Sequence, residues 1–167
     1  MKVAVTGGAG FIGSHLVEKL SKEGLDVVVI DNFEVGREKN YVSRQNTSFV
    51  YCDISTQKEI LIDTLKDVET VYHLAARADV VPSIELPERY FEVNVTGTKN
   101  VMEAARINRV NTVVYAASSS CYGIPDEYPT KETAELRPQY PYALTKCLGE
   151  QLALHWGKVY NMKTISV

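Results

Sequence analysis

The chain has 167 residues, of which 45% are hydrophobic and 23% charged, and this is enough to bury the core of one globular domain. The formal net charge is -3, and Lys and Arg are scattered along the chain, so we expect no nucleic-acid partner. The apolar runs, such as 27–30 and 113–117, are far too short to cross a bilayer, so we expect no membrane partner.

The cysteines and histidines form no recognisable site. Cys52, Cys121 and Cys147 make no C-x-x-C pair, and the three histidines lie far apart in the sequence. Lys2 is followed directly by a short strand pattern and glycines, which is unlike a signal peptide. We therefore expect free thiols, no metal site and a cytoplasmic location.

Short apolar runs alternate with longer helical patterns along the whole chain. The expected strands are 2–6, 26–31, 47–51, 70–73, 112–116 and 163–167, and the expected helices are 12–23, 57–65, 87–108 and 142–160. The strands are continuous runs of Val, Ile, Thr and Tyr, as in strands that are buried on both faces. This alternation predicts an α/β fold, namely a Rossmann-like doubly wound parallel sheet with helices on both faces.

Two connections are longer than packing requires. They are residues 32–46, after the second expected strand, and residues 117–139, after the fifth. Both follow the carboxyl ends of strands, where open α/β sheets bind their ligands. Because long loops in a compact domain are usually functional or disordered, we expect ligand contacts in these segments.

A glycine-rich turn joins the first expected strand to the first helix. Gly8, Gly10 and Gly13 satisfy the G-x-G-x-x-G spacing, and Gly7 precedes them. Such glycines let the backbone approach a pyrophosphate closely, and the helix start offers unpaired N–H groups to the phosphates. Asp31 ends the second strand, 18 residues after Gly13, where a carboxylate accepts hydrogen bonds from the adenosine ribose. Its charge would repel a 2′-phosphate, so the pattern predicts NAD rather than NADP, although Arg37 in the next loop could weaken that preference.

Further motifs extend this pattern along nearly the whole chain. They are Thr6-Gly7-Gly8-Ala9-Gly10-Phe11-Ile12-Gly13-Ser14, Asp31-Asn32, Asp53-Ile54, His73-Leu74-Ala75-Ala76, Asn94-Val95-Thr96-Gly97-Thr98, Ser118-Ser119-Ser120-Cys121-Tyr122-Gly123 and Pro141-Tyr142-Ala143-Leu144-Thr145-Lys146. In this order and spacing the chain resembles the extended short-chain dehydrogenase/reductase family, and within it the NAD-dependent nucleotide-sugar epimerases and dehydratases.

The resemblance implies a set of cofactor-binding residues around a bound NAD. These are Gly7, Gly10, Phe11, Ile12, Gly13, Asp31, Asn32, Asp53, Ile54, Leu74, Ala75, Ala76, Arg77, Asn94, Tyr142 and Lys146. In the family, Asp53 and Ile54 flank the adenine, and the stretch 74–77 lines the middle of the cofactor. Packing of small residues at a strand end would also explain the Leu-Ala-Ala run.

The resemblance also implies a catalytic group of Ser118, Ser119, Tyr142 and Lys146. Tyr142 and Lys146 are four residues apart, so they share one face of a helix. A tyrosine titrates near pH 10, and a neighbouring ammonium and a cationic nicotinamide ring would lower that pKa and make it a base. Ser118 lies four residues before Tyr122, the usual place of the family's substrate-binding serine, and Ser119 could share its role.

The activity that this resemblance implies is that of a nucleotide-sugar 4-epimerase. Tyr142 would take a proton from the sugar as a hydride passes to NAD, and the resulting 4-keto sugar would be reduced on its opposite face. Dehydratases of the family have an acidic residue after the Ser/Thr, but here 119–121 read Ser-Ser-Cys. A 4,6-dehydratase or a decarboxylase is the alternative within the family. A non-catalytic NAD-binding module is an alternative of another class, but it would not need Ser118, Tyr142 and Lys146 together.

The resemblance also predicts which domain of the family this chain contains. Residues 1–167 correspond to its NAD-binding domain, and the C-terminal substrate-binding domain is expected to be absent from this chain. We therefore expect these residues to bind NAD but to be inactive alone. The expected substrate is a nucleotide sugar, with a UDP-sugar as the first candidate, and the expected assembly is a homodimer formed through helices 87–108 and 142–160.

Overall fold

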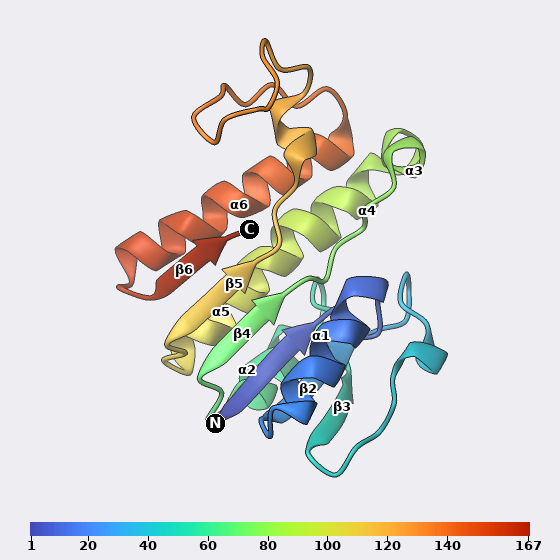
Figure 1. Ribbon diagram of the computed structural model, residues 1–167, viewed down its shortest axis with the longest axis vertical. Coiled ribbons are helices and arrows are strands. Elements are labelled where there is room, and N and C mark those ends of the chain that lie inside the picture. The colour runs from blue at the N-terminus through green and yellow to red at the C-terminus, as the bar shows by residue number, and fades with distance from the viewer.

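Six parallel strands form a single sheet in the computed structural model, which describes residues 1–167. The strands are β1 (Lys2–Thr6), β2 (Asp26–Asp31), β3 (Thr47–Tyr51), β4 (Thr70–His73), β5 (Thr112–Tyr115) and β6 (Lys163–Ser166), in the spatial order β3-β2-β1-β4-β5-β6. The chain therefore crosses the sheet between β3 and β4, and β1 and β4 lie side by side in its centre (Figure 1). This arrangement confirms the predicted doubly wound sheet.

Helices cover both faces of the sheet, but unequally. They are α1 (Phe11–Lys22), α2 (Lys58–Thr64), α3 (Val80–Glu85), α4 (Pro87–Phe91), α5 (Thr98–Ile107) and α6 (Pro141–Val159). Helix α1 lies alone on one face, and α2, α5 and α6 lie on the other (Figure 1). Short 3-10 turns, Glu38–Asn40 and Ser119–Tyr122, lie within the two long connections that the sequence marked.

The predicted helix 87–108 is divided in the structure. A π-helical segment, Glu92–Gly97, separates α4 from α5. A Cβ atom added at Gly97 would lie 2.7 Å from the Ile54 side chain, and one added at Gly149 would lie 3.0 Å from the carbonyl oxygen of Asn94. The π-helical segment is therefore closely packed on both sides, against Ile54 on one side and against Gly149 of α6 on the other. The prediction of one continuous α-helix here was wrong in this detail, and α3 was not predicted.

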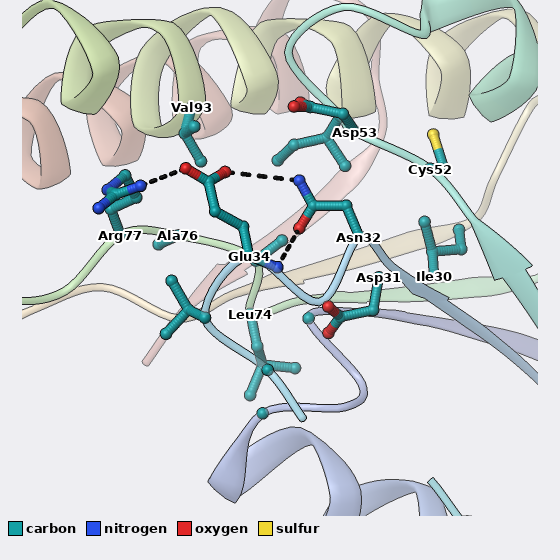
Figure 2. A pocket seen from close by; sticks show the side chains of 16 residues that line it. Ile30, Asp31, Asn32, Glu34, Cys52, Asp53, Leu74, Ala76, Arg77 and Val93 are labelled. Atoms are coloured by element: carbon teal, nitrogen blue, oxygen red, sulfur yellow. Dashed lines mark hydrogen bonds and ion pairs between the residues drawn. The ribbon is translucent and has the colours of Figure 1, made fainter. Parts of the chain in front are cut away.

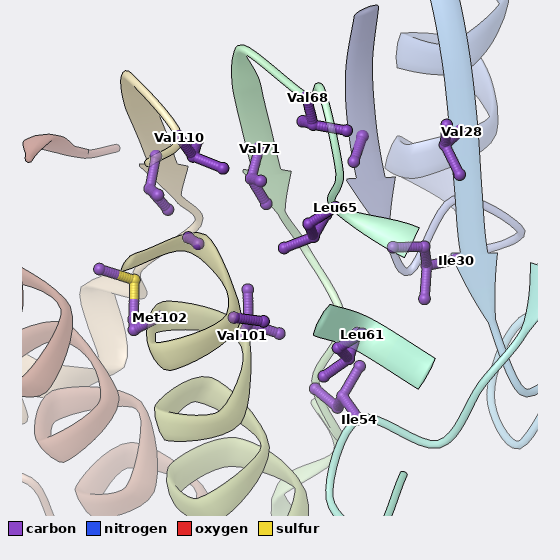
Figure 3. Close-up of a cluster of buried hydrophobic side chains, with 14 of the residues drawn as sticks. Val28, Ile30, Ile54, Leu61, Leu65, Val68, Val71, Val101, Met102 and Val110 are labelled. Carbon is purple, nitrogen blue, oxygen red and sulfur yellow. The ribbon is translucent and has the colours of Figure 1, made fainter. Parts of the chain in front are cut away.

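The larger part of the core lies between the sheet and helices α2, α5 and α6. It joins 18 buried residues, including Ile30, Leu61, Val71 and Met102, several of which Figure 3 shows converging between strands and helices. A smaller cluster of six buried residues, including Val5, Val17 and Val29, packs under α1. Together the two clusters hold the sheet between the helices on its two faces.

Candidate functional site

The glycine turn between β1 and α1 packs tightly against its neighbours. Gly7 has φ +71°, and a Cβ atom there would lie 2.7 Å from the backbone nitrogen of Ala75. A Cβ atom at Gly13 would lie 2.1 Å from the carbonyl oxygen of Gly7, so no larger residue fits. No side chain caps the start of α1 at Gly10, so its first N–H groups remain available to a ligand.

Asp31 ends β2 beneath this turn and is only 7% exposed. Its Oδ2 accepts a hydrogen bond from the backbone N–H of Ala9 at 2.9 Å, and its Oδ1 accepts one from Phe33 at 2.8 Å. The carboxylate thus braces the glycine turn against the loop after β2. Because a carboxylate has about four acceptor positions, it retains capacity to accept hydrogen bonds from a ligand.

A cleft with about 550 Å³ of empty space opens between these loops and the ends of β2, β3 and β4 (Figure 2). The predicted cofactor residues that line it are Gly7, Gly10, Asp31, Asn32, Asp53, Ile54, Leu74, Ala75, Ala76 and Arg77. Six residues that were not predicted as cofactor-binding also line it, namely Ile30, Glu34, Val35, Gly36, Cys52 and Val93. Of the other predicted residues, Phe11 and Ile12 are exposed at the start of α1. Gly13, Asn94, Tyr142 and Lys146 do not line the cleft.

An ion-pair cluster crosses this cleft. Glu34, from the loop after β2, pairs with Arg77 after β4 and, at 2.6 Å, with Arg89 in α4. Arg89 also pairs with Asp53 at 2.7 Å. Burial opposes ionisation of Asp53, but hydrogen bonds from Ser55 and Arg89 outweigh it and lower the pKa of Asp53. The walls of the cleft are therefore joined by charges that stay ionised near neutral pH.

The predicted serine and tyrosine meet at the carboxyl edge of β5. The hydroxyl of Tyr142, in the first turn of α6, donates a hydrogen bond to the Oγ of Ser118 at 3.3 Å. The Oγ of Ser118 also accepts the backbone N–H of Ser120 at 3.2 Å, which fixes the serine at the start of a 3-10 turn. Ser119 begins that turn and does not bond Tyr142. Ser118 is therefore the serine that the structure brings to the tyrosine.

Lys146 lies one turn further along α6 and is only 5% exposed. Its Nζ donates a hydrogen bond to the carbonyl oxygen of Ala116 at 2.6 Å and lies 4.3 Å from the centroid of the Tyr115 ring. Burial lowers the pKa of Lys146 to about 8. A lysine held in this way keeps a fixed position and can gain or lose its proton near neutral pH.

Asn94 connects the cleft to α6. It is buried within the π-helical segment, where its Oδ1 accepts the backbone N–H of Arg77 at 2.8 Å. Its Nδ2 donates to the carbonyl oxygen of Arg77 and to the Oγ1 of Thr145, each at 3.0 Å. Asn94 thus positions the cleft wall relative to the helix that carries Tyr142 and Lys146, without lining the cleft itself.

Comparison with known proteins identifies the family of this chain. Residues 3–167 match the family described as the NAD dependent epimerase/dehydratase family. The chain belongs to this family. It is 39% identical to the UDP-glucose 4-epimerase of Mycolicibacterium smegmatis over 167 residues, a match that covers 97% of this chain and 53% of that protein.

Two solved structures of the epimerase/dehydratase family have the same fold. The UDP-glucose 4-epimerase of Brucella ovis in complex with NAD superposes with a TM-score of 0.92 and 33% identity, over 99% of this chain and 50% of that one. A dTDP-glucose 4,6-dehydratase of Streptomyces venezuelae, with NAD and TYD bound, gives a TM-score of 0.94 and 30% identity over 99% of this chain and 54% of that one. The chain spans about half the length of the curated relatives it matches.

Three further observations bear on this epimerase/dehydratase family member. No three His, Cys, Asp or Glu residues gather as possible metal ligands, and Cys52, Cys121 and Cys147 are free and buried. None of the helices is both long and apolar enough to cross a membrane.

The pairing of Glu34 with Arg89 was not predicted from the sequence. Glu34 lies in a loop that the sequence marked as functional, but nothing in the sequence pointed to Arg89, because the pairing depends on how the fold brings α4 to the cleft.

Proposed function

We propose that residues 1–167 are the NAD-binding part of a nucleotide-sugar 4-epimerase. The observation that carries this proposal is the hydrogen bond from Tyr142 to Ser118, with Lys146 on the next turn of the same helix. A binding module that performs no chemistry has no need for such a group. The names of relatives, UDP-glucose 4-epimerases among them, support the same activity.

The cleft fits a dinucleotide by its shape and its donors. Its glycine turn leaves no room for side chains and offers unpaired N–H groups, which suits a pyrophosphate. We assign Asp31 to the adenosine ribose and Asp53 with Ile54 to the adenine, and the short side chains of 74–76 to the middle of the cofactor. When bound there, NAD would supply the hydride acceptor and donor for the sugar.

The chain's own residues would then bind the sugar hydroxyl and move its proton. We assign Ser118 to orient the hydroxyl and Tyr142 to remove its proton, with Ser119 as a further contact to the substrate. A charged Lys146 beside Tyr142 would favour the phenolate and, in the holoenzyme, would bind the nicotinamide ribose. Lys146 would have to leave the carbonyl oxygen of Ala116 in order to do so.

Epimerisation is favoured over dehydration by the residues that follow Ser118. Ser119, Ser120 and Cys121 form a 3-10 turn without an acidic side chain, and Cys121 is buried, with its Sγ 3.7 Å from the carbonyl oxygen of Ala143. By the resemblance, dehydratases of the family carry the acid that eliminates water from the keto-sugar at these positions of the turn. The turn therefore supports a reaction in which the sugar keeps all its oxygens.

We further propose that residues outside this domain bind the sugar nucleotide, because the relatives are about twice as long. An open hollow beside Ser118 and Ser119, lined also by Glu132, Glu150 and Val167, is the part of the substrate site that this domain would contribute. A UDP-sugar is the substrate that the names of the relatives favour. Helices α5 and α6 would form the contact of a cytoplasmic homodimer, and the exposed Leu154 and Val159 on α6 support this.

The decisive experiment compares the whole protein that contains these residues with residues 1–167 alone. Each is incubated with NAD and UDP-glucose or UDP-galactose, and the products are identified by NMR and mass spectrometry. We expect the whole protein to interconvert the C4 epimers without a change of mass, and residues 1–167 to bind NAD with little turnover. Loss of 18 Da, which is one water, would contradict the epimerase assignment, and rapid turnover by residues 1–167 would contradict the proposed place of the substrate site.

A further inference from the structure

Lys146 is a buried cation whose ammonium group contacts no carboxylate. Its Nζ donates its one hydrogen bond within the protein to the carbonyl oxygen of Ala116, and the side chain is only 5% exposed. An ammonium has three donors, and a buried charge without a counterion in contact is costly. The charged state of Lys146 therefore depends on the charges that lie around it.

Glu150 lies one helical turn beyond Lys146, on the same face of α6. Helix α6 packs along β6 (Figure 1), where the hydroxyl of Ser166 donates a hydrogen bond to the Oε1 of Glu150 at 2.5 Å. Ser166 is paired with Tyr115 of β5, and the next residue of that strand's exit is Ala116, which binds Lys146. The glutamate and the lysine are thus anchored at the same level of two adjacent strands.

Several elements place titratable side chains around Lys146, namely His73 of β4, Tyr115 of β5, Cys121 of the 3-10 turn, and Tyr142 and Glu150 of α6. Burial lowers the pKa of His73 to about 3, so its ring is neutral. Burial raises the pKa of Tyr115 well above its usual range and that of Cys121 to about 11, so both keep their protons near neutral pH. Glu150 is the carboxylate of this group.

The charge of Glu150 opposes the effect of burial on the lysine. Burial lowers the pKa of Lys146 to about 8, and a thiolate at Cys121 or the carboxylate of Glu150 acts in the opposite direction. Because Cys121 is protonated near neutral pH, Glu150 supplies this opposing charge there. Without it, the pKa of Lys146 would fall further, and a smaller fraction of the lysine would be charged beside Tyr142.

We propose that Glu150 is a positioning residue that keeps Lys146 charged during turnover. It acts across one turn of α6 without an ion-pair contact, and the hydrogen bond from Ser166 holds its carboxylate in place. The charged lysine in turn favours the phenolate of Tyr142. The effect on turnover rests on the proposed function, whereas the effect on the charge of Lys146 does not.

The direct test is an NMR titration of Lys146 in residues 1–167. Lysine labelled with carbon-13 at the ε position is incorporated, the Lys146 signal is assigned by its loss in Lys146→Arg, and its chemical shift is followed from pH 6 to pH 10. Glu150→Gln removes the charge but keeps an oxygen that accepts the hydroxyl of Ser166. We expect the pKa of Lys146 to fall from about 8 to about 7.5 or lower, the effect of one charge at the separation of helix neighbours.

Two matched variants separate the charge of Glu150 from its structural contact. Glu132→Gln removes a charge from an exposed position of the same hollow, and solvent screening should keep the pKa of Lys146 within about 0.2 of wild type. Ser166→Ala removes the hydrogen bond but leaves the charge, so the pKa should fall by less than about half as much as in Glu150→Gln. Thermal unfolding verifies that each variant is folded.

In the whole protein, Glu150→Gln should change the pH dependence of turnover. The ratio of variant to wild-type turnover should fall by about 2.5-fold or more between pH 6 and pH 8.5, because Lys146 loses its proton at a lower pH in the variant. A purely structural role would leave this ratio the same at both pH values.

The outcomes separate this inference from the proposed function. An unchanged pKa of Lys146 in Glu150→Gln, or an equal fall in Glu132→Gln, would overturn the inference. A lower pKa with a ratio that does not change with pH would overturn the role of Glu150 in turnover. If the whole wild-type protein lacks epimerase activity, the proposed function fails and that role fails with it, while the titration still decides whether Glu150 keeps Lys146 charged.

Discussion

The two halves of one sheet face are covered differently. Val29, Val5, Tyr72, Val114 and Ile165 form one row across the sheet, from β2 to β6, through the paired registers of neighbouring strands. Under α1, Val5 and Val29 are fully buried, whereas Ile165 is 38% exposed and Val114 and Tyr72 are half-buried. The strands that carry the glycine turn thus form a closed layer. In residues 1–167, the strands that lead to Ser118 and α6 are covered on one face only.

This difference parallels the division of roles that we propose. The closed half holds the cleft, its braced Asp31 and the Glu34–Arg77 pair. The half-covered part carries Tyr142 and Lys146, beside an open hollow. Binding of the dinucleotide should therefore depend on the first half and turnover on the second. The first experiment below tests that separation, and the next two test how firmly the parts of the sheet are packed.

The largest effect should come from Tyr142→Phe in the whole protein. The variant loses the phenolic oxygen but keeps the ring, so turnover should fall by about two to four decades while NAD binding stays nearly unchanged. Steady-state rates and a NAD titration measure both quantities. Tyr140→Phe is the control, because its ring stacks on that of Tyr142 and its hydroxyl makes no hydrogen bond within the protein. Lost NAD binding with normal turnover per bound cofactor would contradict the separation.

A smaller effect should distinguish the covered and uncovered ends of the sheet row. Val29→Ala removes two methyl groups from a fully buried site and should lower the free energy of unfolding by about 2 kcal/mol. Val114→Ala makes the same change at a half-buried position of the same row, and it should cost less than about 1 kcal/mol. Urea unfolding of both variants gives the comparison. Equal costs would show that the second half is as well packed as the first.

The smallest effect near neutral pH concerns His73, at the boundary between the halves. Thr98 donates its own proton to the carbonyl oxygen of Asn94, so the Nε2 of His73 donates to Thr98 at 3.0 Å and its Nδ1 accepts from Thr6 at 2.7 Å. The ring is therefore neutral. Burial, assisted by the charge of Lys146, lowers the pKa of His73 to about 3.

This shift sets the direction of a pH effect. The unfolded chain takes up a proton on His73 below about pH 6.5, whereas the folded protein does so only near pH 3. The contribution of His73 to stability is thus complete above pH 6.5 and decreases by about 1.4 kcal/mol for each pH unit below it, down to about pH 3. Urea unfolding at pH 7, 6, 5 and 4 should show a steeper decrease for wild type than for His73→Phe. Identical slopes would mean that the folded protein binds a proton on His73 as readily as the unfolded chain does.

The sequence predicted the sheet better than it predicted the cleft. All six strands lie where their apolar runs predicted, within a residue, because strands buried on both faces leave a continuous signal. The π-helical segment around Asn94 was not predictable, because it depends on contacts with Ile54 and Gly149 from distant parts of the chain.

The same limit applies to the candidate site. The glycine turn and Asp31 form a local motif, and Ser118, Tyr142 and Lys146 were found through resemblance. Glu34 and Arg89 are 55 residues apart, and only the crossover of the sheet brings them together. Side-chain pairs of this kind follow from tertiary structure rather than from any local pattern.

The position of β1 also has a consequence for how the chain assembles during synthesis. Strand β1 is completed first, but it pairs with β2 on one side and with β4, some 70 residues further along the chain, on the other. A nascent chain thus carries one unpaired edge of β1 until β4 has left the ribosome. Non-local parallel pairing of this kind folds slowly and exposes strand edges that other chains can join. Synthesis paused before residue 73 would therefore leave an intermediate prone to aggregation.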